Sequence, residues 1–206
     1  MSTAIAEAPK RKKEAPSRPK KVATKIPDYL IYEVARGKPI YYKGYKDVLN
    51  GTKTIEEITM ESILQSWLKA QITMFIGTLL KATNYHITVG EMGINLSRHD
   101  KRGADISIFR KDNFRLVDKY ADFPPEIIIE IDVRAEVTDQ HEMDYVAEKI
   151  DDYHKFGVGR IVWIFTKAKK IITANPGQPW LMEDWTVDVE IMEGIRFNVA
   201  KMVEDF

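Results

Sequence analysis

The run Glu-Ile-Ile-Ile-Glu-Ile-Asp-Val at residues 126–133 constrains the fold more than any other segment of this chain. Its isoleucines and valine favour a β-strand, because β-branched side chains suit the pleated backbone. Near-continuous apolar character is typical of a central strand that is covered on both faces. We therefore expect an α/β fold in which this strand lies in the middle of the sheet.

The residues that follow predict a strand–helix–strand unit. Residues 139–157 have the pattern of an amphipathic helix that ends at Gly157, and residues 159–166 form a second apolar strand. The expected core stripe of the helix is Met143, Val146, Ile150 and Tyr153. A helical crossover makes the two strands parallel, so we expect a mixed central β-sheet flanked by helices.

Upstream, Thr54 and Glu57 have the spacing of a capping box, and a helix is predicted over residues 57–82. Its second half is apolar nearly all round, which predicts deep burial. A strand is expected at 104–110. The apolar positions near helical spacing are Met60, Ile63, Leu64, Trp67, Met74, Phe75 and Leu79.

Charge divides the chain into two parts. Residues 1–26 carry eight Lys and Arg against two Glu, a net charge of +6, which leaves −6 for the remainder. This first segment has few large apolar residues, so we expect a disordered basic tail, with residues 27–206 as a single domain. The tail would either attract phosphates or simply aid solubility.

Composition excludes several classes of protein. The 206 residues include no cysteine, which rules out disulfides, thiolate metal sites and cysteine nucleophiles. The four histidines lack paired spacing, which argues against a zinc enzyme. No apolar run reaches the ~18 residues of a membrane span, and residues 1–13 lack the apolar core of a secretory signal. We therefore expect a cytoplasmic protein with no membrane partner.

Carboxylates in and near the central strand carry the functional signal. Glu130 and Asp132 are two residues apart and should share one face of the strand. Asp105 opens the strand at 104–110 and can lie beside Glu130 if the two strands pair. Lys149 flanks the core stripe of the following helix and can extend its ammonium towards the sheet.

Carboxylates in so apolar a strand are costly to bury unless a cation compensates them. Oxygen ligands of this kind favour Mg²⁺ or Mn²⁺. A divalent ion can lower the pKa of a bound water and withdraw charge from a phosphate, while a lysine stabilises developing negative charge. The pattern therefore indicates a metal-dependent phosphodiesterase.

These residues, in this order, resemble the Uma2 family (DUF820) of the PD-(D/E)XK nuclease superfamily. The likeness covers roughly residues 85–170: Asp105, then Pro125 to Asp132, then Lys149 to Val158 with Tyr153 and Gly157, then Arg160-Ile-Val-Trp-Ile. It implies a restriction-endonuclease-like fold and a metal-dependent endonuclease that cuts DNA. It also implies a homodimer, as many nucleases of this fold act in pairs.

Carried over residue by residue, the resemblance makes Asp105 and Glu130 metal ligands and Lys149 a catalytic lysine that has moved from the strand to the helix. It adds a Glu from the first long helix. The candidate for that position is Glu61, with Gln65 and Glu91 as alternatives.

Two positions depart from the family pattern. Ala104 stands where a proline usually precedes the first Asp, and Asp132 stands where the superfamily lysine usually lies. Asp132 is either a further metal ligand and catalytic residue or a sign that the site is inactive. The alternatives are therefore a catalytically inactive nuclease-fold module that binds a partner or nucleic acid, and a phosphodiesterase of small molecules.

DNA binding by the acidic body would need a local basic surface or the tail. The candidate residues for this surface are scattered along the chain: Lys43, Lys46, Lys53, Arg98, Lys101 and Arg102.

Overall fold

The computed structural model describes residues 25–137 and 141–204. The tail predicted over residues 1–26 therefore lies, except for its last two residues, outside the described part of the chain. The principal helices are α1 (Tyr45–Leu49), α2 (Ile55–Thr59), α3 (Ile63–Leu80) and α4 (Glu142–Phe156). The strands are β1 (Ile31–Ala35), β2 (Lys38–Tyr41), β3 (Tyr85–Asn95), β4 (Lys101–Arg110), β5 (Ile127–Ile131), β6 (Arg160–Phe165), β7 (Lys170–Ala174), β8 (Leu181–Asp184), β9 (Val189–Met192) and β10 (Ile195–Phe197).

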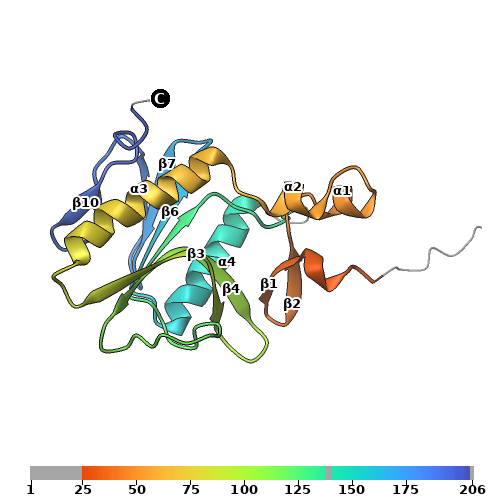
Figure 1. The fold of residues 1–206 in the computed structure, drawn as a ribbon, viewed down its shortest axis with the longest axis horizontal. Coiled ribbons are helices and arrows are strands. Elements are labelled where there is room, and N and C mark those ends of the chain that lie inside the picture. Colours follow the sequence, from red (N-terminus) through yellow and green to blue (C-terminus); the bar gives the residue numbers. More distant parts are fainter. Residues whose placement is uncertain (1–24, 138–140, 205–206) are drawn as a thin grey trace, which may run out of the picture.

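A mixed sheet organises the described residues, as the sequence predicts (Figure 1). Its strand order is β2-β1-β4-β5-β6-β7-β8, with β3 paired to β4. β5 and β6 are parallel and joined through α4, whereas the other pairs are antiparallel. Every residue of β5 is buried, which confirms that this strand is central.

The two long helices cover opposite faces of the sheet. On α3, Leu68, Ile72 and Ile76 pack with Ile127, Ile129 and Ile131 of β5. On α4, Val146 and Ile150 pack with Ile128 and with β6. Alternate residues of β5 therefore belong to different cores, which explains why the strand has apolar side chains on both faces.

The predicted helix over residues 57–82 is interrupted. The capping box of Thr54 and Glu57 is present, but α2 ends at Thr59 and α3 begins only at Ile63. Ser62 and Gln65 form a second capping box that starts α3, and each satisfies a backbone N–H of the other. The helix cap at Ser62 thus starts a new helix within a stretch whose apolar spacing predicts one continuous helix.

The predicted burial of α3 is also wrong. The buried stripe consists of Leu68, Lys69, Ile72, Ile76 and Leu80. All seven residues of the expected stripe are instead exposed, from Leu64 and Trp67 at 37% to Ile63 at 90%. The helix carries two apolar stripes, and its position on the sheet decides which one is buried.

On α4 the prediction is closer. Val146, Ile150 and Tyr153 are buried as expected, but Met143 is 40% exposed. Lys149 is not beside the buried stripe but within it, only 1% exposed. A lysine at such a position needs a partner of opposite charge, and Lys149 has two, Glu33 and Glu130.

Candidate active site

Asp105 and Glu130 are neighbours across the β4–β5 pair. The register matches Ile106 with Ile129, which places Asp105 next to Glu130 on the adjoining strand. Asp105 Oδ2 accepts a hydrogen bond of 2.8 Å from the backbone N–H of Ile131. Both carboxylates are buried, with 4% and 3% exposure. The predicted pairing of these two strands is confirmed.

Lys149 brings a positive charge from α4 to this pair. Its Nζ lies 3.1 Å from Glu130 Oε1 and 2.9 Å from Glu33 Oε1. The hydroxyl of Tyr153, one turn further along the helix, donates to Glu130 Oε1 at 2.7 Å. The structure therefore brings together Asp105, Glu130 and Lys149, the three residues at the centre of the sequence hypothesis.

Sequence reasoning missed Glu33, which comes from β1. Its carboxylate accepts hydrogen bonds from Arg102 Nη1 (2.9 Å), the Tyr145 hydroxyl (2.7 Å) and the Gly103 N–H (2.9 Å). The available signal was an acidic residue within the short apolar run Ile-Tyr-Glu-Val-Ala. Arg102 is only 2% exposed, so its proposed role in contacting DNA is wrong.

We call Glu33, Arg102, Glu130, Tyr145, Lys149 and Tyr153 the buried cluster. Lys149 and Arg102 outweigh the effect of burial and hold the pKa of Glu33 below its usual value. Burial, aided by the negative charge of Asp105, raises the pKa of Glu130 to about 8 even though Lys149 opposes this. Burial alone would lower the pKa of Lys149, but Glu130 and Glu33 raise it well above its usual value, so Lys149 stays an ammonium.

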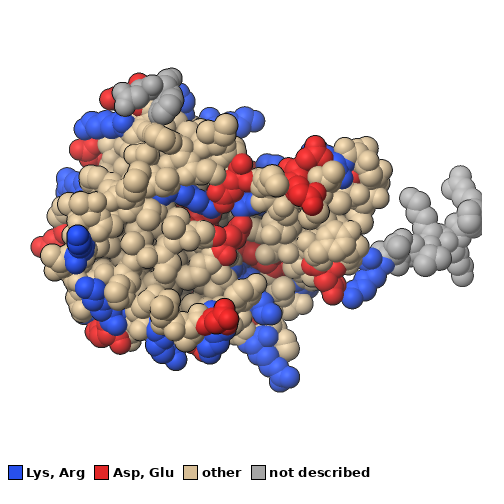
Figure 2. All heavy atoms as spheres, in the orientation of Figure 1, with Lys and Arg blue, Asp and Glu red and all other residues tan. Residues whose placement is uncertain are grey.

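A second set of charges lies on the α3 side of Asp105, and we call Glu61, Lys69, Glu91 and Arg134 the rim cluster. Lys69 Nζ lies 2.5 Å from Asp105 Oδ1 and also pairs with Glu61. Arg134 pairs with Glu61 at 3.4 Å and with Glu91. Figure 2 shows acidic and basic residues gathered in the hollow between the main body and the lobe that holds α1 and α2.

The rim cluster contains the predicted Glu61 and its alternative Glu91. Glu61 lies in the short link before α3, not on the helix as expected. Its side chain is 22% exposed, that of Glu91 is 30% exposed and that of Arg134 is 13% exposed. Glu61, Glu91 and Arg134 of the rim cluster are therefore partly accessible to solvent, whereas Lys69 and the buried cluster are closed to it.

Asp132 does not share a face with Glu130. β5 ends at Ile131, and Asp132 adopts a left-handed conformation with φ 61°. Its carboxylate accepts hydrogen bonds from the Thr166 N–H (2.8 Å), the Thr166 hydroxyl (2.7 Å) and Gln65 Nε2 (3.2 Å). The turn at Asp132 thus ends the alternation of side chains between the two faces of β5. The carboxylate of Asp132 links the end of β6 to α3 through Thr166 and Gln65.

The residues of this site fit the divalent ion that the sequence predicts only in part. Within residues 25–137 and 141–204, no three carboxylates or histidines are grouped as metal ligands. Asp132 does not fit, because its carboxylate is directed to Thr166 and Gln65 and not to the Asp105–Glu130 pair. Asp105 and Glu130 do fit as a pair, since burial leaves Glu130 short of positive charge and both of its contacts use Oε1. Lys69 would have to leave Asp105.

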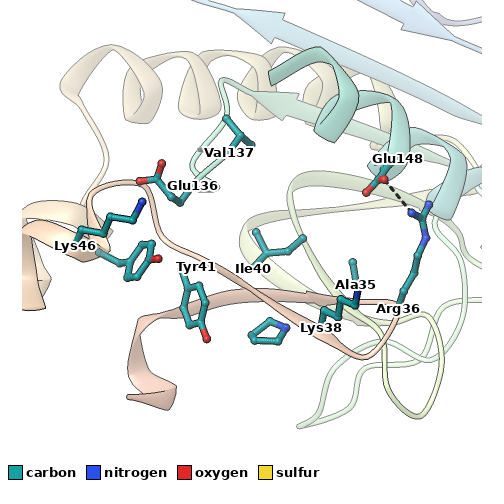
Figure 3. A pocket seen from close by; sticks show the side chains of 11 residues that line it. Ala35, Arg36, Lys38, Ile40, Tyr41, Lys46, Glu136, Val137 and Glu148 are labelled. Carbon is teal, nitrogen blue, oxygen red and sulfur yellow. Dashed lines mark hydrogen bonds and ion pairs between the residues drawn. The ribbon is translucent and has the colours of Figure 1, made fainter. Parts of the chain in front are cut away.

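A separate hollow of about 440 Å³ lies against the β1–β2 hairpin (Figure 3). Arg36 extends across it to Glu148 of α4, at 2.9 Å, and the rings of Tyr41 and Tyr45 stack with their centroids 4.7 Å apart. The lining of this hollow includes neither Asp105 nor Glu130. The partly exposed neighbours of Asp105 are those of the rim cluster, to which Lys69 joins it.

The chain is similar in structure to a protein from Anabaena variabilis that is described as a "putative nuclease belonging to DUF820". The TM-score is 0.62 at 16% sequence identity, over 84% of this chain and 89% of the other. No family model and no curated protein matches the sequence. The likeness shows that the chain has the fold of this DUF820 protein, a restriction-endonuclease-like α/β fold, and so confirms the fold class expected from the sequence.

No helix in the described part of the chain has the length and apolar character to cross a membrane.

Proposed function

We propose that this chain belongs to the Uma2 (DUF820) family and is a Mg²⁺- or Mn²⁺-dependent endonuclease that hydrolyses DNA phosphodiester bonds. The observation that carries the proposal is the meeting of Asp105, Glu130 and Lys149 at one end of the β4–β5 pair. The fold shared with a DUF820 protein adds support. Asp105 and Glu130 would hold the metal ion, which, when bound, would supply an activated water and withdraw charge from the phosphate.

Lys149 would act as a fixed positive charge. Its raised pKa keeps the side chain protonated, so it cannot serve as a general base. Held 3.1 Å from Glu130 Oε1, the ammonium would stabilise the negative charge that develops on a phosphate bound beside this carboxylate. Glu33 and Tyr145 would orient it, because Glu33 lies 2.9 Å from Lys149 and is itself hydrogen-bonded by Tyr145.

The rim cluster would receive the phosphate backbone. Lys69 and Arg134 bind carboxylates in this structure, and a phosphate presents similar oxygen acceptors. A phosphodiester that replaced Glu61 or Glu91 as a partner of these cations would come next to Asp105. If the ammonium of Lys69 followed the phosphate, it would leave Asp105, where the metal ion is proposed to bind.

A plasmid-nicking assay with Mg²⁺ or Mn²⁺ tests the proposal. Asp105→Asn and Glu130→Gln keep the shape of each side chain and should each lower the nicking rate at least 100-fold. Asp132→Asn is the matched control and should stay within a few-fold of wild type. Nicking that survives both of the first two substitutions would refute this site, as would a wild-type protein that nicks no DNA with either ion.

The second candidate is an inactive nuclease-fold module. The observation that favours it is the contact of Lys69 with Asp105, which supplies a cation from the chain itself. Calorimetric titration with Mn²⁺ separates the two. The nuclease requires binding that Glu130→Gln weakens, whereas equal heats for wild type and variant, together with DNA binding but no cleavage, would favour the module. Cleavage of model diesters but not of DNA would indicate a small-molecule phosphodiesterase.

A further inference from the structure

The turn between β6 and β7 is basic. Lys167, Lys169 and Lys170 lie within four residues that contain no acid, and the first two are exposed. Lys170 pairs with Asp184 at 3.1 Å, whereas Lys167 and Lys169 have no acidic partner within residues 25–137 and 141–204. Lys169 Nζ instead lies 5.3 Å from the centre of the Trp185 ring. Two exposed ammonium groups on this turn can therefore meet an anion from outside the chain.

This turn borders the candidate active site. β5 and β6 are parallel, so both strands end at the same edge of the sheet. Thr166, which follows β6, donates its N–H to Asp132 at 2.8 Å, and the residue before Asp132 donates its N–H to Asp105. Figure 1 shows the β6–β7 turn beside the start of α3, which also contacts Asp132. Lys167 therefore begins a basic surface next to the candidate metal ligands.

A third exposed lysine lies on the other side of the site. Lys43 follows β2, and its N–H donates to the carbonyl oxygen of Arg134 in the rim cluster at 2.8 Å. Its ammonium has no acidic partner among the residues that the structure describes. In the strand order β2-β1-β4-β5-β6-β7, the strands of Asp105 and Glu130 lie between Lys43 and the β6–β7 turn. Exposed positive charge thus flanks the two carboxylates.

We propose that Lys43, Lys167 and Lys169 contact phosphates of duplex DNA and hold it across the candidate active site. The choice of DNA as the ligand rests on the proposed function. The cations of the rim cluster, Lys69 and Arg134, are each paired with carboxylates of the chain. Lysines without such partners supply the attraction that brings the phosphate backbone to this acidic edge and fixes its position there.

The spacing of these lysines matches a short stretch of duplex. Through the two backbone hydrogen bonds above and residues 132–134, the Cα atoms of Lys43 and Lys167 are at most about 25 Å apart. At about 3.4 Å per base pair, this span corresponds to roughly seven base pairs. Lys169 is held in place, because its carbonyl oxygen accepts the Trp185 N–H at 3.1 Å while its ammonium lies over the same ring. A phosphate contact at Lys169 therefore orders little additional chain.

Fluorescence anisotropy with a labelled DNA duplex of about 20 base pairs, roughly two helical turns, tests the proposal. EDTA in the buffer prevents metal-dependent cleavage, so binding is measured apart from nicking. Lys167→Gln combined with Lys169→Gln should weaken binding at least about tenfold at about 0.1 M salt. It should also lower the slope of log affinity against log salt by about 1.8, because each lost phosphate contact removes about 0.9. Lys43→Gln should lower this slope by about 0.9.

The matched control is Lys81→Gln. Lys81 is also exposed, but it follows the far end of α3, about 27 Å along the helix from the end that contacts Asp132. Its substitution should leave both the affinity and the salt slope unchanged. A double variant that binds the duplex like wild type, or a wild type that binds no duplex, would overturn the proposal. Tighter binding of duplex RNA of the same sequence would overturn DNA as the ligand.

A plasmid-nicking assay separates this inference from the proposed function. Nicking by wild type, together with unchanged duplex binding by the double variant, would refute the lysine surface and leave the nuclease standing. Duplex binding that depends on these lysines, with no nicking by wild type in Mg²⁺ or Mn²⁺, would support the lysine surface and refute the nuclease.

Discussion

The buried cluster and the rim cluster meet at Asp105 and Glu130 but differ in solvent access. Glu33, Lys149 and Arg102 have side chains at most 1% exposed, with partners from several elements around them. Glu61, Glu91 and Arg134 are partly exposed and pair largely with one another. Charges of the first kind are expensive to separate, whereas those of the second can exchange partners with solvent or a ligand. The buried cluster thus holds its side chains in fixed positions, and the rim cluster is the part of the site that solvent reaches.

The largest effect should come from the buried cluster. Lys149→Met leaves Glu33 and Glu130 without their shared cation, and we expect a loss of about 3–5 kcal/mol in the free energy of unfolding. Lys155→Met, on the same helix with an exposed side chain, should cost less than about 0.5 kcal/mol. Urea denaturation measures both. Equal losses would mean that burial does not distinguish these lysines.

A pH dependence should follow from Glu130. Its pKa is raised to about 8 by burial and by Asp105, so the folded chain holds this proton more tightly than the unfolded chain. Stability present at pH below about 4.5 should therefore be lost as the pH rises towards 8, by at most about 1.4 kcal/mol per pH unit. Glu130→Gln should remove this slope, whereas Glu142→Gln, at an exposed position on α4, should keep it. A slope that persists in Glu130→Gln would assign it to another group.

Breaking the rim cluster should have a smaller effect on stability and a different effect on ligands. Lys69→Met should cost about 1–3 kcal/mol, because Asp105 keeps its hydrogen bond from Ile131 and Glu61 keeps Arg134. It should also tighten Mn²⁺ binding, measured by calorimetry, since no ammonium would compete for Asp105. Adding Asp105→Asn should abolish that gain. Weaker binding in Lys69→Met would show that this lysine supports the metal position instead of competing for it.

The smallest expected effect concerns Asp132, which lies outside both clusters. Asp132→Asn keeps a residue type that tolerates positive φ but loses one carboxylate oxygen, so it should cost about 1 kcal/mol. Thermal unfolding measures this, and Mn²⁺ affinity should remain unchanged. A large drop in the Mn²⁺ affinity of Asp132→Asn would instead indicate that Asp132 is a metal ligand.

Much of the site could be predicted because neighbouring strands carry its main carboxylates. Asp105 and Glu130 lie 25 residues apart in sequence, each in a strand with a clear apolar pattern, and the two strands pair antiparallel. Glu33 could not be placed in the same way. It enters the cluster through β1, a short strand whose contact with β4 includes a single registered pair, Val34 with Lys101. Nothing local in the sequence specifies that contact.

The sequence by itself determined the central strand, the crossover helix and the presence of acidic groups that need compensation. These follow from local backbone preference and from the cost of burying charge, which act on any chain with these residues. Only the tertiary structure decided which cation meets which carboxylate and which stripe of α3 faces the core. Both choices depend on elements distant in the sequence, because a helix with two apolar stripes and a lysine with several carboxylates in reach have no local preference between partners.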